Sequence, residues 1–309
     1  QARDSSAEHA SCAQGQAIGG AQPAPQQLRP AALLLLFIAV AFTVFSYAQD
    51  AADKINEANE ALTGQDYAKA YKLYDEAMSN LGDVEVDASI NFNIGFAAYK
   101  SDNLEGAVKY FDKAIEAGTN VSKCHEYKAL AYNDKKDYKN AVASFEQAVA
   151  TSEEDTESLV YNAAIAAYRG KMYDKAAELF GKSVENGYKG ETAIYYKAAV
   201  LKKQNKDDEY KATLEEGAEK FPGDDKIAPA LANVYVAEGN ELYKAGAAIL
   251  GAANEKVNAG SLKTDEPAYT TEVEKANVEF KKAVEILEKA KALDSSNANA
   301  QALLDACNA

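Results

Sequence analysis

The sequence predicts an all-α fold, a solenoid of about six helix-turn-helix units. A small–aromatic–small pattern recurs along the chain, with steps of 37, 34 and 35 residues between its first members. Each copy is preceded by an apolar-periodic run of helical length and a short polar turn, which indicates a pair of antiparallel helices. The copies are Ala70, Tyr74 and Ala77; Ala107, Phe111 and Ala114; Ala141, Phe145 and Ala148; Ala176, Phe180 and Ser183.

The amino-terminal part of the chain differs from these units. Residues 1–30 lack apolar periodicity, and we expect a disordered or non-native leader there. The run 31–48 carries no charge, follows Arg29 and ends in Ser46-Tyr47-Ala48, the pattern of a secretory signal peptide cleaved after Ala48. The alternative is an uncleaved anchor, although its eighteen residues would rise only about 27 Å as a helix. We expect export to the periplasm or cell envelope, with no membrane insertion after cleavage.

The region 49–224 is expected to hold five units, with boundaries at 51–84, 88–121, 122–155, 157–190 and 191–224. A sixth unit begins at 225 and is interrupted, because its second-helix pattern returns only at Ala283, Leu287 and Ala290. We expect a long helix to about Val257, a loop, and a long returning helix, which together make an extended hairpin. The last segment, from Asn297, is expected to be a helix that caps the array.

Charge and composition exclude several classes of function. The net charge of −15 repels nucleic acid and makes a nucleic-acid partner improbable. Only His9 and His125 occur, so a multi-histidine metal site is excluded. Cys124 and His125 are adjacent, and neighbouring residues on a helix point about 100° apart, so they do not form a nucleophile pair. We therefore expect no enzyme, no catalytic residue, no cofactor and no metal; an enzyme would have to use Cys124.

The recurring slots resemble the tetratricopeptide repeat (TPR) family, whose 34-residue helix-turn-helix units keep small residues where helices cross. Large residues at those crossings would cost roughly 1 to 3 kcal/mol by overpacking. The resemblance implies a right-handed superhelix and suggests an exported bacterial TPR-containing protein. The matching small residues are Gly95, Ala107 and Ala114; Ala129, Ala141 and Ala148; Ala164, Ala176 and Ser183.

In that family the first helix of each unit lines a concave groove, which the resemblance therefore assigns to this chain. Aromatic rings with interleaved amides suit peptide recognition, because tyrosine supplies contact area at low entropic cost. Asn59, Asn93 and Lys123 match a carboxylate clamp known in the family, but the clamp is incomplete here, since Ile55 and Tyr127 replace two expected cations. The candidate groove residues are Phe92, Asn93, Phe96, Tyr99, Lys123, Tyr127, Tyr161, Asn162, Tyr168, Arg169, Tyr195 and Tyr196.

The sequence thus predicts a non-enzymatic scaffold or adaptor in the periplasm or envelope of a Gram-negative bacterium. Its partner would be a peptide segment or protein held in the groove, and the scaffold could dock on a larger envelope complex. The alternative is a glycan-binding module that uses the same tyrosines and asparagines. A glycan site should gather its rings in one pocket, whereas a peptide groove spreads them over successive units.

Overall fold

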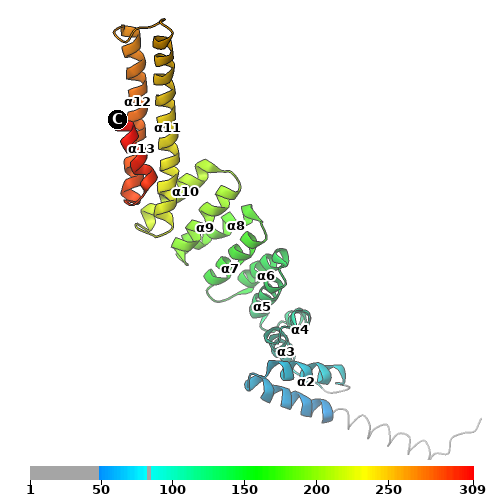
Figure 1. The fold of residues 1–309 in the computed structure, drawn as a ribbon. Coiled ribbons are helices and arrows are strands. Elements are labelled where there is room, and N and C mark those ends of the chain that lie inside the picture. Colours follow the sequence, from blue (N-terminus) through cyan, green and yellow to red (C-terminus); the bar gives the residue numbers. More distant parts are fainter. Residues whose placement is uncertain (1–48, 82–84) are drawn as a thin grey trace, which may run out of the picture.

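The computed structural model describes residues 49–81 and 85–309, and in these ranges the chain is helical, with turns and no strand. A helix over 49–63 opens the array shown in Figure 1. The helices that follow are α2 (Tyr67–Ser79), α3 (Ile90–Lys100), α4 (Leu104–Glu116), α5 (Val121–Asp134), α6 (Tyr138–Thr151), α7 (Glu157–Arg169), α8 (Tyr173–Glu185), α9 (Gly190–Lys203), α10 (Asp207–Lys220), α11 (Ile227–Asn258), α12 (Pro267–Leu293) and α13 (Ala298–Asn308). The all-α solenoid predicted from the sequence is confirmed.

The turn inside each unit is built the same way in five successive units. One residue of the turn has positive φ, and the residue after it is the N-cap of the second helix. In three units the residue before that helix caps it with a side-chain oxygen, which accepts a hydrogen bond from the backbone amide three residues on. The positive-φ residues are Gln65, Asp102, Lys136, Lys171 and Asn205, and the capping residues are Asp66, Asn103 and Asp137.

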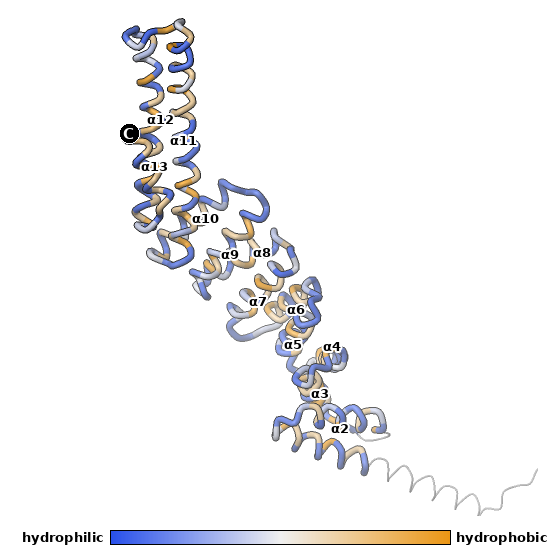
Figure 2. The backbone as a smooth tube through the Cα atoms, viewed as in Figure 1, coloured by the Kyte–Doolittle hydropathy of each residue, from blue (hydrophilic) through white to orange (hydrophobic). Residues whose placement is uncertain are grey.

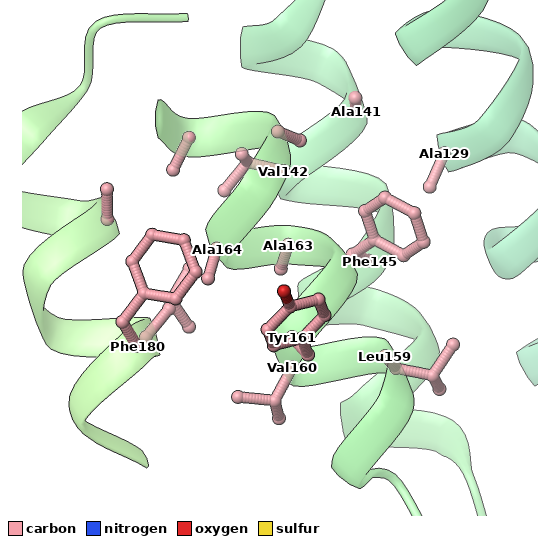
Figure 3. Packing of buried hydrophobic residues seen from close by; sticks show 14 of the residues in the cluster. Ala129, Ala141, Val142, Phe145, Leu159, Val160, Tyr161, Ala163, Ala164 and Phe180 are labelled. Atoms are coloured by element: carbon pink, nitrogen blue, oxygen red, sulfur yellow. The ribbon is translucent and has the colours of Figure 1, made fainter. Parts of the chain in front are cut away.

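The core follows the small–aromatic–small pattern. Ala107, Phe111 and Ala114 have no exposed surface, and the copies in the next two units are buried as well. Figure 3 shows Phe145 and Phe180 on opposite sides of α7, with Ala163 and Ala164 between them. In Figure 2, hydrophilic residues (blue) predominate in the turns, and hydrophobic residues (orange) lie within the helices. Small residues at the crossings let the helices approach, and the recurring phenylalanine fills the space between units.

The last unit is extended into a hairpin in which α11 and α12 run side by side, as Figure 1 shows. Small buried residues recur every seventh position on both helices: Ala232, Gly239, Gly246 and Ala253 on α11, and Ala276, Ala283 and Ala290 on α12. A seven-residue spacing keeps one seam of each helix facing the other, as in a coiled coil. Helix α13 packs beside the base of this hairpin. Across 49–81 and 85–309, no helix combines the length and apolarity needed to cross a membrane.

Candidate functional site

The candidate groove residues lie on α3, α5, α7 and α9, the first helices of four successive units; we call the outward side of these helices the first-helix surface. Eleven of the twelve have accessible side chains on it. Lys123, Asn162 and Arg169 are exposed. The half-buried residues are Asn93 and seven aromatic residues, whose rings are packed on one side and open on the other: Phe92, Phe96, Tyr99, Tyr127, Tyr168, Tyr195 and Tyr196.

Tyr127 of α5 lies at the centre of an aromatic cluster between the second and third units. Its ring stacks on Phe111 of α4, with 5.8 Å between centroids and 15° between planes. Phe96 and Tyr99 of α3 contact the same ring, at centroid distances of 5.3 and 5.8 Å. Phe92 completes the cluster at 6.0 Å from Tyr127. Offset-stacked and edge-to-face pairs at these distances stabilise one another, so the cluster is ordered without a ligand.

A second cluster lies between the fourth and fifth units. Tyr196 of α9 stacks on Phe180 of α8, with 5.4 Å between centroids and 12° between planes. Tyr168 of α7 contacts Tyr196 at 5.5 Å, and Tyr195 lies at 6.1 Å from it. The stacked pair therefore has the same geometry as Tyr127 on Phe111.

Tyr161 is a correction to the prediction, because it is buried, with 7% of its surface exposed. Its ring lies edge-on to Phe180 at 6.0 Å and to Tyr188 at 5.8 Å, and Nζ of Lys189 lies 4.7 Å above it. Burial raises the pKa of its phenol. Tyr188, from the turn between α8 and α9, packs against a ring that the repeat position alone would leave accessible. Tyr161 is therefore a packing residue, and Figure 3 shows its ring among the buried side chains of the core.

Polar bonds join neighbouring first helices along the same surface. The hydroxyl of Tyr99 donates to Asp134 at 3.1 Å, from α3 to α5. Burial, and secondarily the Asp134 charge, raises the pKa of Tyr99 to about 12. Nη1 of Arg169 donates to Oδ1 of Asn133 at 3.4 Å, from α7 to α5. These contacts fix the side chains of adjacent units relative to one another.

The first-helix surface is less acidic than the protein as a whole. Exposed cations stand at the ends of three of its helices: Lys100 on α3, Arg169 on α7 and Lys203 on α9. Nζ of Lys100 lies 5.6 Å from the centroid of Phe96, within the range of a cation–π contact. Lys123 is instead paired with Glu126 at 2.9 Å. The surface therefore offers positive charge to a ligand, although the whole chain carries −15.

The remnant of the carboxylate clamp is partly used in packing. Oδ1 of Asn59 accepts a hydrogen bond from the buried hydroxyl of Tyr74 at 2.5 Å. Asn59 therefore anchors a core tyrosine, and the pairing of Lys123 with Glu126 further weakens the case for a clamp.

Sequence reasoning missed three contributors to the surface. Tyr67 of α2 meets Phe96 edge-on, with 5.9 Å between centroids and 86° between planes. Phe111 and Phe180, which the repeat pattern marked as core, also form the floor beneath Tyr127 and Tyr196. The recurrence of phenylalanine at one position of the second helix could have predicted this floor. Phe111 and Phe180 occupy that position, and each contacts the first helix of the following unit.

The buried cysteine is unsuited to nucleophilic chemistry. Cys124 has no exposed surface, and its thiol lies 3.5 Å from the carbonyl oxygen of Thr119. Burial raises the pKa of this thiol to about 12, so it is protonated at neutral pH. Among the residues that the structure describes, no group of three or more His, Cys, Asp or Glu side chains could hold a metal ion.

No protein-family model matches the sequence, and no curated protein matches it. Among solved structures, the chain is similar to a TPR repeats protein from Bacteroides fragilis at 20% identity, covering 84% of this chain and 98% of that one, with a TM-score of 0.35. A tetratricopeptide repeat protein from Parabacteroides merdae matches at 19% identity, covering 84% and 100% of the two chains, with a TM-score of 0.44. YrrB, a TPR protein with an unusual peptide-binding site, matches at 18% identity over 77% and 97%, with a TM-score of 0.38. At these identities the likeness concerns the fold and assigns no role to individual residues of this chain.

Proposed function

We propose that this protein is a helical-repeat scaffold whose first-helix surface binds an extended segment of a partner protein. The observation that carries the proposal is the arrangement of the accessible rings, which follow one another along α3, α5, α7 and α9. Such an arrangement offers a track across several units, and an extended chain is the ligand that can follow a track.

The rings are suited to binding because they are ordered beforehand. Tyr127 and Tyr196 each stack on a buried phenylalanine, and further rings pack against their edges. A ligand therefore contacts large apolar faces without having to immobilise them, which removes part of the entropic cost of association. Exposed Asn162 and the three cations add polar contacts that orient the ligand.

The spread of these rings disfavours the glycan alternative. A single sugar site would need its aromatic faces around one pocket, whereas the two clusters centre on different helices, α5 and α9. Tyr161, one of the candidate tyrosines, is buried in packing, so its loss would perturb folding under either hypothesis.

Site-specific photo-crosslinking in the native cell tests the proposal. A photo-crosslinking amino acid replaces Asn162, which is exposed on α7, and in a matched variant it replaces Ala143, which is exposed on the second helix α6. We expect one partner protein to be captured from position 162 and not from 143, at a single extended segment located by mass spectrometry. The same partner captured equally from both positions, or none from 162, contradicts the proposal.

We also propose that the scaffold works outside the cytoplasm, in the periplasm or as part of an envelope assembly. The support is the uncharged run 31–48 with its small-x-small ending, which lies outside the described residues. Amino-terminal sequencing of the protein purified from cells tests this: export with cleavage predicts a chain that begins at Gln49, and a chain that retains 31–48 contradicts cleavage.

A further inference from the structure

We propose that the first-helix surface carries two matched subsites, two units apart, that bind one extended peptide with two apolar anchors, the second of which lies beside an acidic residue. This inference rests on the proposed function and specifies its ligand. The first subsite consists of Tyr99, Lys100 and Tyr127 above the buried ring of Phe111, and the second of Tyr168, Arg169 and Tyr196 above the buried ring of Phe180.

The two subsites correspond residue by residue, because each member of the second lies 69 positions after its counterpart in the first. Their geometry corresponds as well. The two tyrosine rings are 5.8 Å apart in the first subsite and 5.5 Å in the second. The stacked tyrosine lies 5.8 Å above Phe111 and 5.4 Å above Phe180. A cation directly follows the first tyrosine in both.

Between the two subsites, the repeat positions that carry the subsite tyrosines carry asparagines instead. Asn133 stands at the position of Tyr99 and Tyr168, and Asn162 at the position of Tyr127 and Tyr196. Phe145, the counterpart of Phe111 and Phe180, is buried beneath this unit. An asparagine side chain both donates and accepts hydrogen bonds, which matches the alternating groups of an extended peptide backbone. The surface thus alternates apolar anchor, amide and apolar anchor.

The repeat relation constrains the ligand. Successive units present the same side chain in the same orientation, so both anchors must approach in the same sense, as they do along one extended chain. Successive units pack on one another, as α4 packs on α5 and α6 on α7, and packed helices lie about 10 Å apart. At about 10 Å per unit, subsites two units apart are separated by about 20 Å. An extended chain rises about 3.4 Å per residue, so the anchors should be about six residues apart.

Charge distinguishes the two ends. In the first subsite Asp134 accepts the hydroxyl of Tyr99, and its charge opposes that of the neighbouring Lys100. The residue that corresponds to Asp134 in the second subsite is Lys203, so there Arg169 and Lys203 are both positive. An acidic side chain is therefore favoured beside the second anchor only, and this fixes the direction of the peptide.

Selection of peptides against the intact chain tests this inference. A random dodecapeptide phage library is panned on the immobilised protein, and enriched peptides are synthesised with a fluorescent label for anisotropy titration. We expect two apolar residues about six apart, with an acidic residue beside one of them. Half-peptides that keep one anchor should bind at least 100-fold more weakly, because the second contact is intramolecular in the full peptide.

Variants locate each anchor. Tyr127→Ala and Tyr196→Ala should each weaken the full peptide at least tenfold, whereas Tyr269→Ala in the hairpin should leave affinity unchanged. Lys203→Glu, at an exposed position that does not threaten folding, should weaken the acidic peptide at least fivefold and leave its amide-substituted version unaffected. Circular dichroism establishes that each variant is folded.

The outcomes separate this inference from the proposed function. Peptides with one anchor, or with anchors at unrelated spacings, that still lose affinity on Tyr127→Ala would overturn the two-subsite model and leave peptide binding intact. If substitution of Tyr127, Tyr196 and Lys203 leaves the affinity of every selected peptide unchanged, both the two-subsite model and the proposed function are overturned.

Discussion

Gly95 and Phe111 lie so close together that a β-carbon on Gly95 would stand 2.7 Å from Cδ1 of the phenylalanine ring. The missing side chain lets the ring lie against α3, and its other contacts include the stacked ring of Tyr127. The corresponding positions in the next three units are Ala129, Ala164 and Ala198. A single glycine in the core thus helps to set the position of the first aromatic cluster on the surface.

Gly95→Ala should lower the free energy of unfolding by about 1 to 3 kcal/mol, because the new methyl group forces the Phe111 ring to move. Alanine favours helices by about 1 kcal/mol over glycine, so propensity alone predicts the opposite sign. Gly181→Ala is the matched control, since Gly181 is also helical and its β-carbon would meet nothing within 4 Å. Urea denaturation should show Gly181→Ala unchanged or stabilised, and a stabilised Gly95→Ala would refute the close contact.

An asparagine that caps one second helix should also cap another second helix whose N-cap residue has the same backbone conformation. Asn103 has φ −88° and ψ 77° and accepts a bond from the amide of Gly106, while Lys206 has φ −92° and ψ 69° without a side-chain cap. Asn103→Ala should therefore destabilise the protein by about 1 kcal/mol, and Lys206→Asn should stabilise it by a similar amount. Thermal melts of the two variants and of their double mutant, which should return near the wild-type value, check both signs.

The packing of α11 against α12 in the hairpin should depend on the small residues along their contact seam. A β-carbon on Gly246 would lie 2.7 Å from Cε1 of Phe280, whereas one on Gly251 in the same helix would meet nothing within 4 Å. Gly246→Ala should accordingly loosen α11 from α12, and Gly251→Ala should not. Hydrogen exchange over 240–280 should speed up in the first variant only; equal protection in both would mean that the seam tolerates a methyl group.

Stability should fall at high pH partly because of Tyr74. Burial raises the pKa of this phenol to about 12, against about 10 in the unfolded chain. The stabilisation that the buried, protonated phenol gives to the folded state is therefore complete below pH 10 and is lost as the pH rises towards 12. The stability difference between the wild type and Tyr74→Phe should shift against the wild type by about 1 kcal/mol from pH 8 to pH 11. Urea titrations at the two pH values measure it, and a pH-independent difference would argue against the raised pKa.

Cys124 should resist thiol reagents in the native state. Its side chain is buried and protonated, whereas Cys307 is partly accessible. Maleimide labelling followed by peptide mass spectrometry should modify Cys307 at neutral pH and leave Cys124 unmodified until urea is added. Rapid native labelling of Cys124 would indicate that α5 opens far more readily than its packing suggests.

Much of the fold follows from residues that are close in sequence. The alternation of small and aromatic residues on each second helix sets its buried face, so the pairs of helices and their order could be predicted from their period alone. The hairpin was predictable because the pattern of the second helix is displaced to Ala283, Leu287 and Ala290. All of these features can be inferred without information about contacts between a helix and residues outside its own unit.

The candidate site was less predictable, and Tyr161 shows why. Tyr161 and Tyr195 occupy the same repeat position, yet only Tyr195 is accessible. The turn before α9 supplies Tyr188, which covers Tyr161, while the turn before α11 has Pro222 at the corresponding position. The exposure of one ring thus depends on a residue in another turn, and no pattern within a helix records it.

The sequence by itself determined the helices, their pairing and the set of first helices that carry tyrosine, amide and cationic side chains, because each of these is a property of local periodicity. Only the tertiary structure decided which rings are buried beneath others, which rings cover a neighbour and which rings stay accessible. That outcome depends on contacts between adjacent units and their connecting turns: Phe111 beneath Tyr127, Phe180 beneath Tyr196 and Tyr188 over Tyr161. The same residue type therefore becomes core in one unit and surface in another.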